Sequence, residues 1–144
     1  MFDRIVLAVD GSGPSERAEG VAAETAEKFS SDVTVVHVLE HEFSWMGDLA
    51  IETPDEASQL ADDVVRRLKD RGLTARGEVR HAPVALVARE ILDVAKEADA
   101  GLIVMGTRGL TDWKGLLLGS VAHKVMQHAT CPVLLVRIEE ELHG

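Results

Sequence analysis

Residues 104–121 read VMGTRGLTDWKGLLLGSV, and this stretch determines how the rest of the chain is interpreted. An apolar run ends at Gly106, Gly109 follows, and Gly119 with Ser120 stands after a gap of nine residues. Glycine allows a backbone to approach a ligand closely. A strand that ends in glycine before the start of a helix can direct several backbone N–H groups at one anion. The spacing therefore predicts a phosphate site lined by Gly106, Gly109, Gly119 and Ser120.

The helix that follows this loop strengthens the prediction. The amides of Ser120 and Val121 and the Ser120 hydroxyl would meet the phosphate at the positive end of the helix. Arg108 lies inside the loop, where a guanidinium is able to pair with phosphate charge. The same residues also fit a surface loop with an exposed arginine and an ordinary serine cap, and both interpretations stand at this point.

Composition excludes several classes of function. The 144 residues fit one domain, residues 1–144. The net charge of −10, from 25 acidic and 15 basic residues, argues against nucleic acid and against anionic membranes as partners. No apolar run approaches the roughly 18 residues of a membrane span. The N-terminal segment is acidic, so we do not expect it to act as a signal peptide. We therefore expect a cytoplasmic protein.

The single cysteine, Cys131, cannot form an internal disulfide or a thiolate metal cluster. It lies in an apolar run, so we expect it to be buried and inert.

Five short apolar runs predict strands, and segments with helical apolar spacing lie between them. The Thr53-Pro-Asp-Glu56 capping box opens the second helix, Pro83 opens the third and Ser120 caps the fourth. Residues 41–53 show no period and are expected to form a long loop. The alternation of strands and helices predicts a parallel sheet with right-handed crossovers and helices on both faces. The predicted strands are 4–9, 33–39, 73–81, 101–105 and 131–138.

Ligands of such sheets bind beyond the carboxyl ends of the strands, where the winding direction reverses. Asp10 ends the first strand and Gly106 ends the fourth, so we expect these two strands to be neighbours at that point. Asp10 is a candidate to hold a ribose hydroxyl, or a divalent cation such as Mg²⁺ on the phosphates. Capping of the turn into the first helix is an equal alternative. The residues alone thus predict a nucleotide or a similar phosphate-bearing ligand.

No set of residues predicts catalysis. The six histidines are scattered. His37 lies in a strand, where we expect a satisfied core or edge histidine; the alternative is a side chain directed at the ligand edge. Neither a nucleophile nor a general base stands out, so we expect at most slow hydrolysis of a bound nucleotide.

With these motifs established, the chain resembles the universal stress proteins of the UspA type. The resemblance is carried by the opening IVLAVDGSGPSERA, by the VVHVL strand, and by the stretch from GLIVMG to CPVLLV, which contains the full motif G-2x-G-9x-G-S. It implies an α/β fold that is Rossmann-like and similar to the adenine nucleotide alpha-hydrolases. The sheet would have five parallel strands in the order 3-2-1-4-5. Family members with the motif bind ATP, so the resemblance implies ATP, ADP or AMP as the ligand.

The resemblance also implies roles for individual residues. The adenine and ribose would meet the end of the first strand, the second strand and the end of the fourth, and the phosphates would meet the glycine loop. The implied base and ribose set is Ala8, Val9, Asp10, Val38, Met105 and Gly106. The implied phosphate set is Arg108, Gly109, Gly119, Ser120 and Val121. One departure is His81-Ala82-Pro83, where many members have Gly-x-Pro.

The position of the last predicted strand in the sheet indicates how copies of the chain would assemble. In the order 3-2-1-4-5 this strand lies at the edge of the sheet, where an apolar strand must be covered or paired. Pairing across a two-fold axis is the economical solution, and coverage by residues 139–144 is the weaker alternative because that tail is short and charged. The resemblance implies a homodimer through Val133, Leu134, Leu135 and Val136.

The leading hypothesis is a cytoplasmic ATP-binding stress or regulatory protein that responds to nucleotide. The first alternative is a homodimeric interaction module that binds no nucleotide. The second is a true ATPase or nucleotidyl transferase, which would require measurable turnover.

Overall fold

The computed structural model of the chain describes residues 1–44, 47–50, 52–108 and 118–137. Strands and helices alternate along most of it. The strands are β1 (Arg4–Ala8), β2 (Asp32–Ser44), β3 (Gly47–Ala50), β4 (Thr74–Pro83), β5 (Leu102–Gly106) and β6 (Val133–Val136). The helices are α1 (Gly13–Phe29), α2 (Pro54–Asp70), α3 (Val87–Glu97) and α4 (Ser120–His128), with a 3₁₀ turn, η1 (Val84–Leu86), before α3.

The parallel part of the sheet runs β4-β2-β1-β5-β6, which is the order 3-2-1-4-5 of the parallel strands. The predicted order is confirmed. Strand β1 lies at the centre, with Ile5 opposite Val33 of β2 on one side and Leu102 of β5 on the other. The chain winds outward from β1 in both directions, so the switch point lies between β1 and β5, as predicted.

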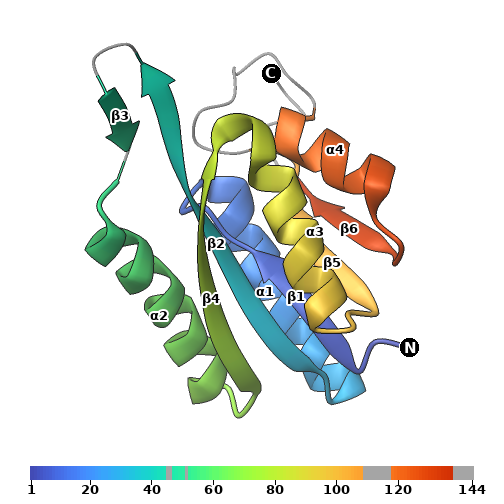
Figure 1. Ribbon diagram of the computed structural model, residues 1–144. Helices are drawn as coiled ribbons and strands as arrows, with labels where there is room; N and C mark the ends of the chain where they lie inside the picture. The colour runs from blue at the N-terminus through green and yellow to red at the C-terminus, as the bar shows by residue number, and fades with distance from the viewer. Residues whose placement is uncertain (45–46, 51, 109–117, 138–144) are drawn as a thin grey trace.

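Helices cover both faces of the sheet, because alternate strand residues point to opposite sides. Ile5, Leu7 and Val9 belong to the core formed with α1 and α2. Val6 and Ala8 belong to the core formed with α3 and α4. In Figure 1, α3 and α4 lie in front of the sheet and α1 lies behind it.

The predicted capping box opens α2. Thr53 Oγ1 accepts the Glu56 N–H at 3.1 Å, and Glu56 Oε1 accepts the Thr53 N–H at 3.3 Å. Gly72, two residues beyond the end of α2, has a φ of +83°, a conformation that glycine adopts without strain. Local sequence signals therefore fix both ends of this helix.

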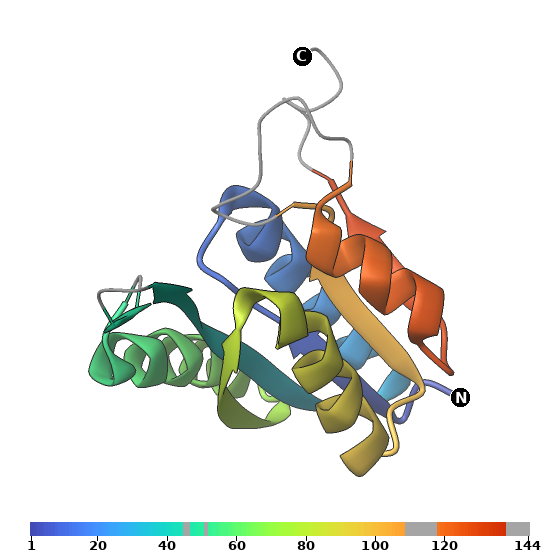
Figure 2. The same ribbon diagram turned by 45° about the horizontal axis from the view of Figure 1, so that its top comes forward.

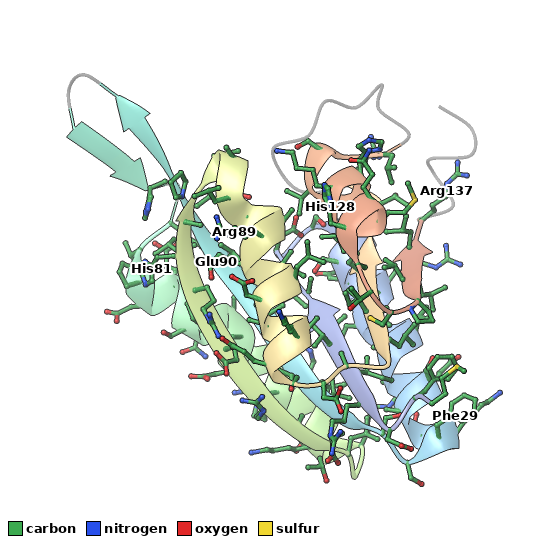
Figure 3. All side chains as sticks on the ribbon, turned by 45° about the vertical axis from the view of Figure 1, so that its right-hand side comes forward. Phe29, His81, Arg89, Glu90, His128 and Arg137 are labelled. Carbon is green, nitrogen blue, oxygen red and sulfur yellow. The ribbon has the colours of Figure 1, made fainter. Side chains whose placement is uncertain are left out.

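The prediction of a long loop over residues 41–53 was wrong. Strand β2 continues to Ser44 and pairs with the antiparallel β3. Apolar periodicity reports burial against a core, whereas β3 contacts chiefly its partner strand, so backbone pairing forms the hairpin without a periodic signal. The end of β2 and β3 project from the body of the chain beyond His81 of β4 (Figure 3).

Two helix starts differ from the prediction. Pro83 ends β4, and α3 begins at Val87 after η1; a proline suits an edge strand, where its missing N–H breaks no pairing. The cap of α4 is Gly119 with extended dihedrals, and Ser120 is the first helical residue.

Cys131 is half-buried rather than buried. Desolvation raises the pKa of its thiol, which agrees with the expected low reactivity. None of the helices in the described part of the chain is both long and apolar enough to cross a membrane.

Candidate functional site

A cavity of about 350 Å³ opens at the carboxyl ends of β1 and β5, beside the middle of β2, on the edge that comes forward in Figure 2. This volume is in the usual range for small-molecule sites. The cavity is lined from β1, the turn after it and the first turn of α1 by Ala8, Val9, Asp10 and Ser15, and from β2 by Val36, His37, Val38 and Glu40. The remaining lining residues are Glu52, Glu56, Val84, Val87, Ile91, Met105, Gly106, Thr107, Arg108, Ser120, Val121 and Ala122.

Most of the predicted site residues meet in this cavity. They are Ala8, Val9, Asp10, Val38, Met105, Gly106, Arg108, Ser120 and Val121. Gly119 is buried directly before α4, and Gly109 lies outside the described residues. The structure therefore brings together, from three strands and one helix, residues that lie more than a hundred positions apart in the chain.

A hydrogen bond joins the two described ends of the glycine loop. The Gly119 N–H donates to the Thr107 carbonyl at 2.6 Å. The Thr107 N–H donates to the Val136 carbonyl at 3.0 Å, and the Thr107 residue is buried. Because of these bonds, the end of β5 and the start of α4 are held side by side at the cavity.

The first turn of α4 faces the cavity through Ser120, Val121 and Ala122. The first N–H groups of a helix have no partner inside the helix. Gly119 at the cap position has no side chain to accept from them. These amides and the positive end of the helix dipole therefore form a local environment suited to an anion.

Asp10 fixes the turn between β1 and α1. Its Oδ1 accepts the Ser12 N–H at 2.9 Å, and its own N–H donates to Ser15 Oγ at 3.0 Å. Ser12 caps α1 by accepting the Ser15 N–H at 3.2 Å. The alternative role of Asp10, capping of the turn into α1, is present, and the same carboxylate also lines the cavity.

Three carboxylates line the opposite side of the cavity from α4. Glu40 comes from β2, Glu52 lies just before α2, and Glu56 lies in the first turn of α2. Arg108 and the N-terminus of α4 lie on the β5 side. Since β1 separates β2 from β5, the cavity has one acidic side and one side that favours anions.

The wall of the cavity between these two sides is apolar. It is formed by Ala8, Val36, Val38, Val84, Val87, Ile91 and Met105. Val84, Val87 and Ile91 recur at helical spacing after Pro83, which predicts from sequence only that they share one face of a helix. Helical spacing identifies such a face but not which of its members line a cavity rather than the core.

His37 and Glu52 are two of the pocket residues that sequence reasoning did not assign to the site; Ser15, Glu40, Glu56 and Thr107 are others. His37 Nδ1 lies 2.7 Å from the Val9 carbonyl oxygen, and its Nε2 contacts Glu52 Oε1. The expectation of a satisfied histidine is correct. For His37 the sequence offered one signal, its position beside Val38. For Glu52 it offered none, because Glu52 lies in a stretch with no periodic pattern.

The donor set near the phosphate side fits a magnesium ion carried by a ligand. Asp10 supplies a hard oxygen ligand, and Mg²⁺ usually binds one or two carboxylates plus substrate phosphates. Among the described residues, no group of three or more acidic, histidine or cysteine side chains is placed to hold a metal.

The fold and the cavity define a doubly wound α/β domain with a ligand-sized pocket at its switch point. The chain belongs to the universal stress protein family, whose profile matches residues 1–137. A universal stress protein of Thermus aquaticus is 37% identical over 140 residues, covering 95% of this chain and all of the relative. One from Bacillus subtilis is 31% identical over 159 residues with the same coverage of both chains.

Solved structures share the fold. UspA from Lactobacillus plantarum superposes with a TM-score of 0.76 at 22% identity, over 94% of this chain and 98% of that one. A universal stress protein in complex with cAMP gives a TM-score of 0.67 at 26% identity, over 94% and 97% of the two chains. The protein from Archaeoglobus fulgidus in complex with dAMP gives 0.68 at 26%, over 94% and 98%.

Proposed function

We propose that this chain binds an adenine nucleotide in the cavity at the switch point and acts as a nucleotide-responsive regulatory protein of the cytoplasm. The observation that carries the proposal is the Gly119–Thr107 hydrogen bond. It holds the end of β5 beside the first turn of α4, so that Gly106, Ser120 and Val121 surround one part of the cavity. Two similar proteins with solved structures hold cAMP and dAMP, both adenine nucleotides.

The distribution of charge favours one orientation of the ligand. The phosphates lie against the α4 N-terminus, Ser120 and Arg108, where amides and a guanidinium stabilise negative charge. The base lies between Val38 and Met105 on the apolar wall. The carboxylates on the far side would repel phosphates placed there, which opposes the reverse orientation.

ATP with Mg²⁺ is the ligand we propose first, with ADP and AMP as alternatives. Asp10 would then contact the ribose or the cation, and hydrolysis would be slow at most.

Two measurements test this proposal. Pure protein is denatured and the supernatant is assayed for bound nucleotide, and the melting temperature of ligand-free protein is measured with ATP. Released nucleotide or a saturable rise in melting temperature supports the proposal. A protein that releases none and shows no shift supports the alternative of an interaction module without nucleotide.

We also propose that the chain forms a homodimer through Val133, Leu134, Leu135 and Val136. Strand β6 lies at the edge of the sheet, and Leu134 at its centre is 39% exposed. An apolar edge strand of this kind is stabilised by pairing with a second copy. Sedimentation equilibrium tests this: the expected mass is that of two chains, and a single-chain mass at high concentration contradicts it.

A further inference from the structure

His37 is a buried titratable residue with both ring nitrogens in contact with other groups. Its side chain is 5% exposed, Nδ1 lies 2.7 Å from the Val9 carbonyl oxygen, and Nε2 contacts Glu52 Oε1. The Glu52 side chain is 24% exposed, and both residues line the cavity. The pair therefore connects the end of β1, the middle of β2 and the residues just before α2.

The contacts determine how many protons the pair holds. A carbonyl oxygen only accepts hydrogen bonds, so His37 Nδ1 must carry a hydrogen to bond Val9. Nε2 and Glu52 then need one proton between them, either as imidazolium with carboxylate or as neutral imidazole with carboxylic acid. If that proton leaves, a nitrogen lone pair faces a carboxylate, and the attraction is replaced by repulsion.

The position of Glu52 follows from the hairpin. His41 pairs with Pro83 of β4 on one edge of β2 and with Ala50 of β3 on the other. Strand β3 therefore pairs with the same edge of β2 as β1 does, but nearer to the carboxyl end of β2. The chain consequently returns to the carboxyl end of β1, and the contact with His37 fixes it there directly before the Thr53 cap of α2.

The charged groups that share the cavity with the pair are the carboxylates of Asp10, Glu40 and Glu56 and the guanidinium of Arg108. They come from the β1–α1 turn, β2, α2 and the end of β5. In the proposed orientation the phosphates lie across the cavity from Glu52, so the coupling acts through the contact that holds the residues before α2 against the pocket. Proton uptake and nucleotide binding are then coupled, and by linkage each strengthens the other equally.

We propose that His37 and Glu52 are positioning residues that share one proton and thereby hold the start of α2 against the nucleotide pocket, so that binding is coupled to retention of that proton. The inference rests on the proposed function. It predicts that nucleotide affinity falls as the pair loses its proton, by up to about tenfold per pH unit.

Glu52→Gln keeps the contact with His37 but removes its dependence on a shared proton. The glutamine amide donates to a neutral Nε2 without any shared proton, so the contact persists at every pH. We expect the affinity of wild type to fall with rising pH relative to that of Glu52→Gln, measured by calorimetry with AMP. Ionisation of the AMP phosphate affects binding to both proteins equally, so it cancels in the ratio of the two affinities. Glu56→Gln, which removes a carboxylate from the same acidic side of the cavity, should keep the wild-type pH profile.

A second measurement uses the ligand-free protein. In NMR spectra, the His37 ring nitrogens and the Thr53 and Glu56 amides should titrate together in wild type, and the two amides should not titrate in Glu52→Gln. Parallel affinity profiles for wild type and Glu52→Gln, with normal binding, would overturn this inference and leave the proposed function standing. Absence of binding at any pH would refute the proposed function, and the amide titration would then still decide whether the pair holds the start of α2.

Discussion

Gly106 packs directly against Pro14: a Cβ built on Gly106 would lie 2.7 Å from the Pro14 Cβ and 2.9 Å from the Pro14 carbonyl carbon. These separations are shorter than real Cβ contacts allow. Glycine at the end of β5 thus permits the close approach of the first turn of α1. The approach places the turn that holds Asp10 beside the start of the glycine loop, and both border the same cavity.

Gly106→Ala should therefore weaken both stability and ligand binding. The added methyl group meets backbone and a rigid proline ring, so β5 and α1 must separate. We expect the free energy of unfolding to fall by about 1–3 kcal/mol, measured by urea denaturation. Nucleotide affinity should fall as well, measured by calorimetry on the folded fraction.

Gly20→Ala is the matched control. A Cβ at Gly20 in the interior of α1 meets nothing within 4 Å. This variant should be more stable by roughly 0.5–1 kcal/mol because alanine favours the helix. If Gly106→Ala and Gly20→Ala behave alike, the contact with Pro14 is not what requires glycine at residue 106.

Ser120→Ala should lower nucleotide affinity without changing stability. Ser120 stands at the first helical position and does not cap α4, so the fold does not depend on its hydroxyl. One hydrogen bond to phosphate is lost, and we expect an affinity loss of about 2–10-fold. Calorimetry and thermal melting are run on the same preparation. Unchanged affinity would remove the Ser120 hydroxyl from the proposed phosphate set.

Asp10→Asn should remove the effect of Mg²⁺ on nucleotide affinity. The Asn Oδ1 still accepts the Ser12 N–H, so the turn is kept and unfolding free energy should change by less than about 1 kcal/mol. The affinity for ATP is compared with Mg²⁺ and with a chelator. Wild type should bind more tightly with Mg²⁺ and the variant should not. A variant that keeps the full Mg²⁺ effect would show that Asp10 does not contact the cation.

Leu134→Glu should convert the proposed homodimer into a monomer. Leu134 is 39% exposed at the centre of the edge strand β6, and two copies of a carboxylate across a two-fold axis repel each other. Sedimentation velocity should show the smaller species, with nucleotide affinity retained. A variant that remains dimeric would place the interface elsewhere.

Cys131 should react slowly with thiol reagents at neutral pH. Burial raises the pKa of its thiol, so a smaller fraction is thiolate, the reactive form, at each pH below that value. Alkylation of Cys131 by iodoacetamide should be slower than alkylation of a free cysteine peptide. The alkylation rate of Cys131 should also rise over a higher pH range than that of the peptide. Reaction faster than the peptide at neutral pH would contradict this.

The sequence predicts the parallel sheet because buried strands leave continuous apolar runs such as residues 4–9. It predicts much of the pocket because spaced glycines before a helix start, with a carboxylate at a neighbouring strand end, are typical of a phosphate site. It does not predict the β2–β3 hairpin, which backbone pairing forms without an apolar period. The His37–Glu52 contact follows from that hairpin, so it could not be predicted either.

The most direct test of the central claim is an NMR titration of ¹⁵N-labelled, ligand-free protein with ATP. We predict saturable shifts at the amides of Gly106, Thr107, Ser120 and Val121, with Val38 marking the base. Shifts confined to the other end of the sheet, around Arg4 and Arg76, or no saturable shifts at all, would contradict it.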